Sequence, residues 1–179
     1  MEIKESFYAY FKINGNLLTK EFKEEQLHLN EEWFYYYNQY QTMFPYTVKI
    51  HEYSTKHLVM DYINEPTLNN IFENKIVGSS IQETKTIINN VHKNVHEIIA
   101  SFYEFALHVN KGFWHTDLNS TNIILSDPMK LIDPNSFKLD EFVRLNTDDI
   151  LMVIIQKSYL NKHINERIYK TKLEIEHFE

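Results

Sequence analysis

The first 63 residues alternate apolar and polar positions in a pattern that predicts strands around one helix. Residues 7–13 and 17–22 are strand-like, and Asn14-Gly15 between them is typical of a tight hairpin turn. From 24 to about 40 no Gly or Pro interrupts the chain, and positions 27, 31, 34 and 38 step at helical spacing. After Pro45, strands are predicted at 46–53 and 56–62. The aromatic group at 33–37 could be core or interface, and a helix stripe favours core.

Residues 64–179 are predicted to be mainly helical. A short helix follows Pro66 and ends near Phe72, before the break at Gly78. From 81 to 110, a long helix is predicted from an apolar face. The residues of this face are Ile81, Ile88, Val91, Val95, Ile98, Phe102, Phe105 and Val109. A further helix is predicted from about 149 to 160, and the charged stretch 157–179 could pack on the domain or present an edge to a partner.

Composition narrows the class of protein. The chain of 179 residues suits one domain or two small lobes. It has no Cys, which excludes disulfides and thiolate metal sites, and its net charge of -7 argues against nonspecific nucleic-acid binding. No apolar run approaches the ~20 residues that span a bilayer, so we expect a cytoplasmic protein without a membrane partner. Usage rich in Asn, Ile and Lys suggests AT-rich coding and a viral, phage or low-GC bacterial source.

Residues 115–133 carry the most specific chemical signal. His115, Asp117 and Asn122 form the pattern H-x-D-x-x-x-x-N, which an apolar run follows at 123–125. Asp133 comes after a second short apolar segment. Asp and Asn are also ordinary loop formers, because they satisfy their own backbone in turns. The ordered combination nevertheless resembles the catalytic loop and metal-binding acid of protein kinases, and of the aminoglycoside and choline kinase-like phosphotransferases.

This resemblance implies an α+β, two-lobed protein-kinase-like fold of reduced size. The N-lobe, residues 1–63, would be a small antiparallel sheet, and the C-lobe, residues 64–179, would be mainly helical and truncated. Asp117 would accept the proton of an attacking hydroxyl, while Asn122 and Asp133 would hold Mg²⁺. His115 would brace the loop. The implied cofactors are ATP and Mg²⁺.

The same resemblance asks for a Lys and a Glu in the N-lobe. Lys20 is the candidate that holds the phosphates, with Lys23 as its alternate. On the following helix, Glu31 is the first candidate to align the Lys, and Glu32 the second. Charges are plentiful in this region, so a solvated helix face explains them equally well.

Residues 58–63 resemble the last N-lobe strand and the hinge that binds adenine. Met60 would lie near the rear wall of the pocket. The backbone of the next residues would bond the adenine ring, and these are Asp61, Tyr62 and Ile63. A buried strand that ends in a loop fits the local pattern equally well.

Several departures from the family pattern point away from a regulated protein kinase. No Gly-rich loop precedes the Lys candidate, and there is little chain for a full first strand pair. Pro134-Asn135 follows Asp133 where protein kinases carry Phe-Gly. Thr116 replaces the Arg that reads a phosphorylated loop, and Asn119 replaces a Lys.

The acceptor side is also short. No A-P-E segment follows Asp133, and the helices that dock peptides in protein kinases are largely missing. Asp149 resembles the helix Asp that braces the catalytic loop in the aminoglycoside branch, although Thr147 or Asp148 could simply cap a helix. We therefore expect an acceptor such as a sugar, amino alcohol or nucleoside, with no nucleic-acid partner.

The sequence thus favours an ATP- and Mg²⁺-dependent phosphotransferase that acts on a small hydroxylated molecule. The main alternative is a pseudokinase that binds nucleotide or serves as a structural module. A protein kinase and an AMP-transferase are weaker alternatives. The complete triad of Asp117, Asn122 and Asp133 favours the enzyme, whereas the missing glycine loop favours the pseudokinase.

Overall fold

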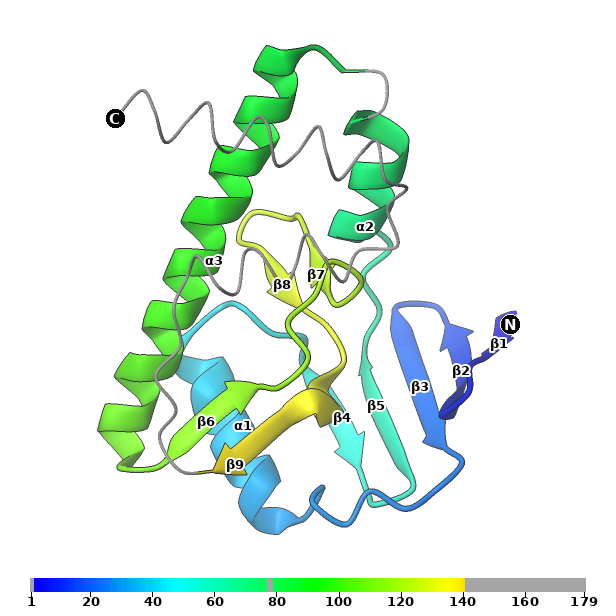
Figure 1. The fold of residues 1–179 in the computed structure, drawn as a ribbon. Helices are drawn as coiled ribbons and strands as arrows, with labels where there is room; N and C mark the ends of the chain where they lie inside the picture. Colours follow the sequence, from blue (N-terminus) through cyan, green and yellow to red (C-terminus); the bar gives the residue numbers. More distant parts are fainter. Residues whose placement is uncertain (1, 77–78, 141–179) are drawn as a thin grey trace.

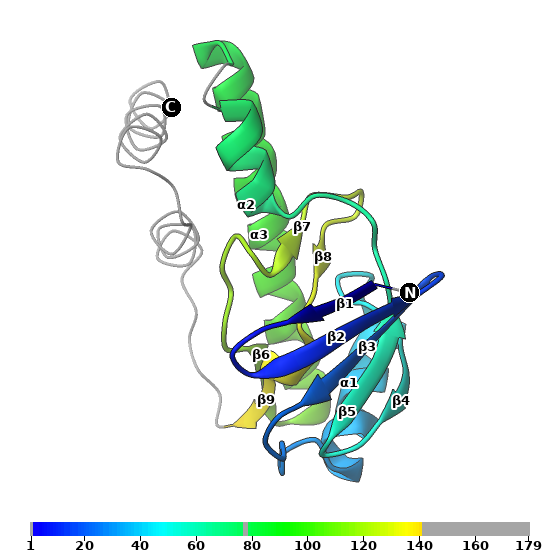
Figure 2. The ribbon, with the colours of Figure 1, turned by 90° about the vertical axis from the view of Figure 1, so that its right-hand side faces the viewer.

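The computed structural model describes residues 2–76 and 79–140. Its N-terminal part is a five-stranded antiparallel sheet with strand order β1-β2-β3-β5-β4. The strands are β1 (Glu2–Glu5), β2 (Ala9–Asn14), β3 (Leu17–Phe22), β4 (Ile50–Tyr53) and β5 (His57–Asp61). Figure 2 shows them side by side, in front of the long helix of the C-terminal part. The predicted hairpin is confirmed, and its turn uses Gly15 at φ 60°, a backbone conformation that suits glycine.

Strand β1 was not predicted from the sequence. It pairs with β2 from Glu2 to Glu5, so the chain does have a full first strand pair. The turn between the two strands, residues 6–8, is closed by the Ser6 hydroxyl. This oxygen accepts from the amides of Tyr8 at 3.3 Å and Ala9 at 3.0 Å. Four residues that alternate mostly charged side chains carry too little apolar pattern to be recognised as a strand.

Helix α1 (Glu31–Met43) begins later than residue 24, where the sequence pattern placed its start. Asn30 sets the boundary, because its side-chain oxygen accepts the Trp33 amide at 2.9 Å and caps the helix. Trp33, Tyr37 and Tyr40 are buried along one face of α1. The prediction that this aromatic stripe is core is therefore confirmed.

The C-terminal part is built on α3 (Ile81–Val109), which matches the predicted long helix. Ser80 and Glu83 form a capping box at its start, and Asn110 ends it in the left-handed conformation at φ 52°. The shorter α2 (Leu68–Ile71) precedes it and runs into a π-helical turn, Phe72–Ile76. Figure 1 shows α3 running along most of the height of the molecule.

Two short strand pairs follow α3, and the sequence predicted neither. They are β6 (Gly112–His115) with β9 (Phe137–Asp140), and β7 (Ile123–Ile124) with β8 (Lys130–Leu131). The first pair sets His115 opposite Phe137, and the second sets Ile123 opposite Leu131. Such short strands are fixed by their pairing, because two to four residues show no period.

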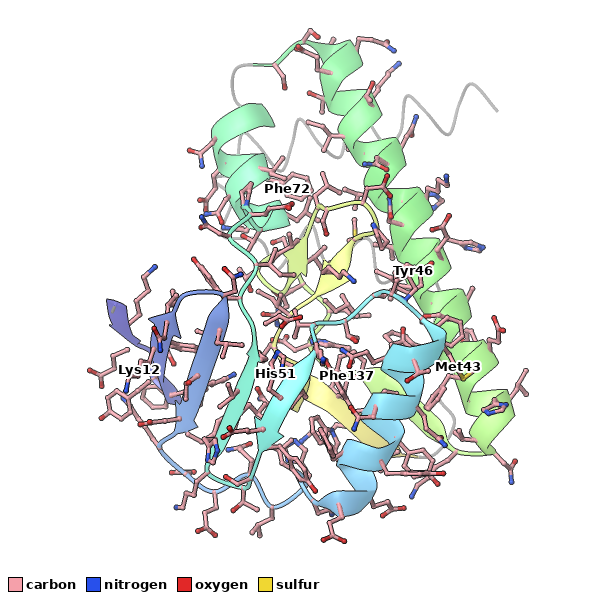
Figure 3. The ribbon with its side chains drawn as sticks, turned by 180° about the vertical axis from the view of Figure 1, so that it is seen from behind. Lys12, Met43, Tyr46, His51, Phe72 and Phe137 are labelled. Carbon is pink, nitrogen blue, oxygen red and sulfur yellow. The ribbon has the colours of Figure 1, made fainter. Side chains whose placement is uncertain are left out.

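One apolar core joins the N-terminal and C-terminal parts. Phe137, which is labelled in Figure 3, is fully buried in this core. Its ring stacks on that of Phe113 with the ring centroids 5.1 Å apart, and the centroid of the Tyr40 ring lies 5.9 Å away. The indole N–H of Trp33 also donates to the Phe137 carbonyl at 2.9 Å. Helix α1 is thus held against β9 by packing and by a buried hydrogen bond.

These elements confirm the predicted α+β class, with a small antiparallel-sheet lobe and a mainly helical lobe. The predicted helices after residue 140, with Asp149, Thr147 and Asp148, lie outside the described residues. Within the described ranges, no helix is both long enough and apolar enough to cross a bilayer.

Candidate active site

The loop between β6 and β7 joins Asp117 directly to Asn122. The side-chain amide of Asn122 donates to Asp117 Oδ2 at 2.9 Å and to the Asp117 carbonyl at 3.0 Å. This clamp across the loop fixes the carboxylate orientation. Both hydrogens of the Asn122 NH₂ group are used in these two bonds. The side-chain carbonyl oxygen is therefore the Asn122 atom that suits a cation.

His115 lies beneath this loop and is only 1% exposed. Its Nε2 lies 3.1 Å from the Ile132 carbonyl, and its Nδ1 accepts the Asp117 amide at 3.2 Å. Burial lowers the pKa of His115, although the Asp133 carboxylate and the Ile132 carbonyl oppose the shift. A neutral imidazole that donates from Nε2 satisfies both contacts. His115 therefore connects the loop to the segment before Asp133.

Asn119 and Ser120 serve the shape of the loop. Asn119 Oδ1 accepts from the Thr121 amide at 2.9 Å, an arrangement that closes a tight turn. Ser120 is fully buried, and its carbonyl accepts the Asn69 amide of α2 at 2.9 Å. The side chains of Ser120 and Asn69 also contact each other, at 3.3 Å. Helix α2 thus holds the loop between β6 and β7 in place through Asn69.

Asp133 is brought beside this loop by the β7–β8 pair. Ile132 lies between the end of β8 and Asp133, and its amide donates to the Asn122 carbonyl at 2.9 Å. Asp133 adopts the left-handed conformation at φ 68°, which is uncommon outside glycine. Its Oδ2 accepts the Ser136 hydroxyl at 2.7 Å. These contacts stabilise the left-handed backbone at Asp133.

Lys20 extends from β3 to this carboxylate and is itself only 8% exposed. Its ammonium forms an ion pair with Asp133 Oδ1 and donates to Asn135 Oδ1 at 2.7 Å. Burial on its own would raise the pKa of Asp133, but the Lys20 ammonium and the Ser136 hydroxyl outweigh it and lower that pKa. Lys23 instead pairs with Glu5 at 2.6 Å. Of the two Lys candidates, Lys20 is therefore the one at the site.

The structure does not bring Glu31 to Lys20. Glu31 is exposed and lines an open groove on the outer side of α1 together with Met43 and His108. Glu32 is exposed as well, and it pairs with Lys111 at 2.5 Å. With 3.6 residues per turn, burying the aromatic stripe of α1 necessarily turns Glu31 outward. The expected Lys–Glu pair with α1 is thus replaced by the contacts of Lys20 with Asp133 and Asn135.

The residues of the predicted hinge span the end of β5 and the segment that follows it. Met60 is buried, while Asp61 donates its amide to the Lys49 carbonyl at 2.9 Å. The Asp61 side chain contacts Nε2 of His51 at 2.7 Å. His51 lies on β4 (Figure 3). The Tyr62 amide donates to the Asn16 carbonyl at 2.8 Å. The amides of Asp61 and Tyr62 are thus both bonded to backbone carbonyls.

Sequence reasoning missed the contributions of Asn135, Ser136 and Asn69. Asn135 and Ser136 directly follow Asp133-Pro134, and Pro134 starts the short 3-10 turn that directs them back to the site. Their closeness to Asp133 in the sequence was the signal that could have identified these two residues. The role of Asn69 carried no such signal, because its contact with the loop between β6 and β7 is made only in the folded chain.

The solved structures to which this chain is similar include two aminoglycoside phosphotransferases. The first is aminoglycoside phosphotransferase APH(2'')-Ib with ADP bound, at 11% identity over 97% of this chain and 82% of that chain, with a TM-score of 0.43. The second is the streptomycin–ATP–APH(2'')-IIa ternary complex, at 11% identity over 96% and 76%, with a TM-score of 0.46. No family model matches the sequence, and no curated protein sequence matches it. The site is therefore interpreted from its own geometry.

Proposed function

We propose that this protein is an ATP- and Mg²⁺-dependent phosphotransferase that phosphorylates a hydroxyl of a small molecule. The proposal is supported by two side-chain pairs at this site. Asn122 is hydrogen-bonded to Asp117, and Lys20 forms an ion pair with Asp133. The backbone bond from Ile132 to Asn122 ties the two pairs together. Phosphoryl transfer needs a positioned hydroxyl, a cation for the phosphates and oxygen ligands for a metal, and these residues provide each.

In this mechanism, the oxygen of the acceptor hydroxyl attacks the γ-phosphorus of ATP, and Asp117 accepts the proton of that hydroxyl. The bond from phosphorus to the β,γ-bridging oxygen breaks, and ADP leaves with that oxygen. The Asn122 amide keeps the Asp117 carboxylate turned toward the hydroxyl. Lys20 binds the phosphate oxygens and offsets their charge.

The Asn122 side-chain carbonyl and the Asp133 carboxylate suit Mg²⁺, since both are hard oxygen donors. Within residues 2–76 and 79–140, no cluster of three or more metal-binding side chains is found. Two protein ligands fit a metal that completes its shell with phosphate and water. When bound, such a metal would neutralise charge on the phosphates, and Asp133 would have to exchange its Lys20 contact for it.

A nucleotide-binding pseudokinase is the second candidate, and the β1–β2 turn favours it. Glycine-rich loops hold phosphates with free backbone amides. Here the Ser6 hydroxyl already accepts the Tyr8 and Ala9 amides. Phosphate binding would then depend more heavily on Lys20, which could permit nucleotide binding with little turnover.

Two measurements separate these candidates. Thermal shift with ATP or ADP, with and without Mg²⁺, tests nucleotide binding. ATP turnover is then measured with sugars, amino alcohols, nucleosides and aminoglycosides as acceptors. The enzyme proposal expects Asp117→Asn to keep nucleotide binding and to lose about 100-fold or more in turnover.

The matched control is Glu104→Gln, which neutralises an exposed acid on α3 and should leave turnover unchanged. Nucleotide binding by the unmodified chain without turnover on any acceptor would favour the pseudokinase. An absence of nucleotide binding would reject both candidates.

A further inference from the structure

We propose that Asn135 is the residue that positions Lys20 for phosphate binding, in the role expected of a carboxylate on α1. The inference rests on the proposed function, because positioning Lys20 matters only if Lys20 binds phosphate. It assigns a task to a residue that the sequence pattern marked only as a departure. Three features support it, namely the contacts of Lys20, the anchoring of Asn135 and the orientation of α1.

The contacts of Lys20 are made almost entirely below the protein surface. Its ammonium has two anionic or polar oxygen partners in the described part of the chain, Asp133 Oδ1 and Asn135 Oδ1. The rings of Phe11 and Phe22 lie 5.6 Å and 5.4 Å from the ammonium. These aromatic faces limit where the ammonium can move, while the two oxygens set its direction.

Asn135 is itself fixed from the loop before α1. His28 Nε2 lies 2.8 Å from the Asn135 carbonyl oxygen. Burial lowers the pKa of His28, and the Asn135 carbonyl only partly opposes that shift. A neutral His28 that donates from Nε2 suits this contact. Asn135 therefore bridges β3, through Lys20, and the loop at His28.

Helix α1 cannot supply this contact without losing its core packing. Rotating Glu31 or Glu32 toward Lys20 would expose the buried stripe that includes Trp33 and Tyr40. It would also break the bond from Trp33 Nε1 to the Phe137 carbonyl. Exposing one large aromatic side chain costs several kcal/mol, so the observed orientation is strongly favoured.

The role of Asn135 would become decisive if Asp133 bound a metal. Lys20 would then lose its ion-pair partner, and the Asn135 side-chain oxygen, which lies 2.7 Å from the ammonium in this structure, would be the polar group that holds it. Without that oxygen, Lys20 would sample other rotamers and would bind phosphate less well. The expected consequence is weaker ATP binding, with a smaller effect on the chemical step.

The first test compares Mg²⁺–ATP affinity by calorimetry. Asn135→Ala should weaken binding about tenfold, because a hydrogen bond to a charged group is lost. Asn135→Asp retains an acceptor oxygen and should recover most of that affinity. The matched control Glu31→Gln should bind as the unmodified chain does. Normal affinity in Asn135→Ala, or a larger loss in Glu31→Gln, would overturn the proposal.

The second test needs no nucleotide. In an Asp133→Asn background, acetylation of the Lys20 amine is followed by peptide mass spectrometry, with Lys23 as the internal reference. Adding Asn135→Ala should speed Lys20 acetylation severalfold, and equal rates would contradict the positioning role. Circular dichroism checks that each variant is folded. If the unmodified chain binds no ATP while acetylation responds as expected, the proposed function fails and the positioning of Lys20 stands.

Discussion

Lys20 on β3 and Asp133 after β8 form an ion pair between the sheet and the C-terminal part of the chain. The two side chains are only 10% and 23% exposed, so solvent screens their attraction weakly. Removing either side chain would destabilise the fold, because the remaining charge would be buried with neither water nor an ionic partner around it. The pair thus links the stability of the fold to the geometry of the candidate active site.

We expect a double-mutant cycle on this pair to show strong coupling. Lys20→Met should destabilise the protein more than Lys20→Met combined with Asp133→Asn, because the single variant leaves a carboxylate unpaired. The coupling free energy, measured by urea denaturation, should be about 1–3 kcal/mol. Additive effects of the two substitutions would mean that the pair contributes nothing to folding.

The indole N–H of Trp33 provides a second prediction. Trp33→Phe removes its bond to the Phe137 carbonyl and leaves that buried oxygen unsatisfied. The free energy of unfolding should fall by about 1–3 kcal/mol beyond the loss due to side-chain size. Urea denaturation measures the change.

Trp114 offers a matched control for this substitution. Its Nε1 is buried and has no hydrogen-bond partner among the described residues. Trp114→Phe makes the same chemical change without breaking a bond, and it removes an unsatisfied donor. It should therefore cost clearly less than Trp33→Phe. Equal losses at the two positions would show that the Trp33 bond does not stabilise the contact between α1 and β9.

The buried His115 predicts how stability responds to pH. Burial lowers its pKa in the folded chain below the ordinary value of 6.5. Below about pH 6.5 the unfolded chain then binds a proton that the folded chain does not, so stability falls as pH falls. The slope should be at most about 1.4 kcal/mol per pH unit from this residue. His28, whose pKa is also lowered by burial, adds in the same direction.

Urea denaturation from pH 7.5 to pH 5 measures this slope. His115→Gln should be less stable at pH 7.5 but should lose less stability on acidification. His108→Gln, at an exposed position on α3, serves as the control and should keep the full slope. If His115→Gln keeps the full slope as well, the histidine is not neutral in the folded protein.

The sequence indicated the elements that have a clear period or a clear boundary. The hairpin at Asn14-Gly15 and the helix over 81–110 were predicted correctly, because turn chemistry and an apolar face are local signals. Strand β1 and the pairs β6–β9 and β7–β8 were not, since their pairing depends on distant partners.

The candidate site shows the same division. The pattern H-x-D-x-x-x-x-N marked Asp117 and Asn122, which are in contact in the structure. The partner of Lys20 could not be predicted in the same way, because it depends on which face of α1 is buried. The charges of Glu31 and Glu32 were visible in the sequence, but their direction was decided by the packing of Trp33 and its aromatic neighbours.

We propose that Asp133 and its neighbours bind a metal–nucleotide complex. The most direct test is calorimetric titration of ATP, with and without Mg²⁺, into the unmodified chain and into Asp133→Asn. We expect Mg²⁺ to tighten ATP binding to the unmodified chain by on the order of tenfold, and to have little effect on Asp133→Asn. Binding that is absent, or that responds equally to Mg²⁺ in both proteins, would contradict the account.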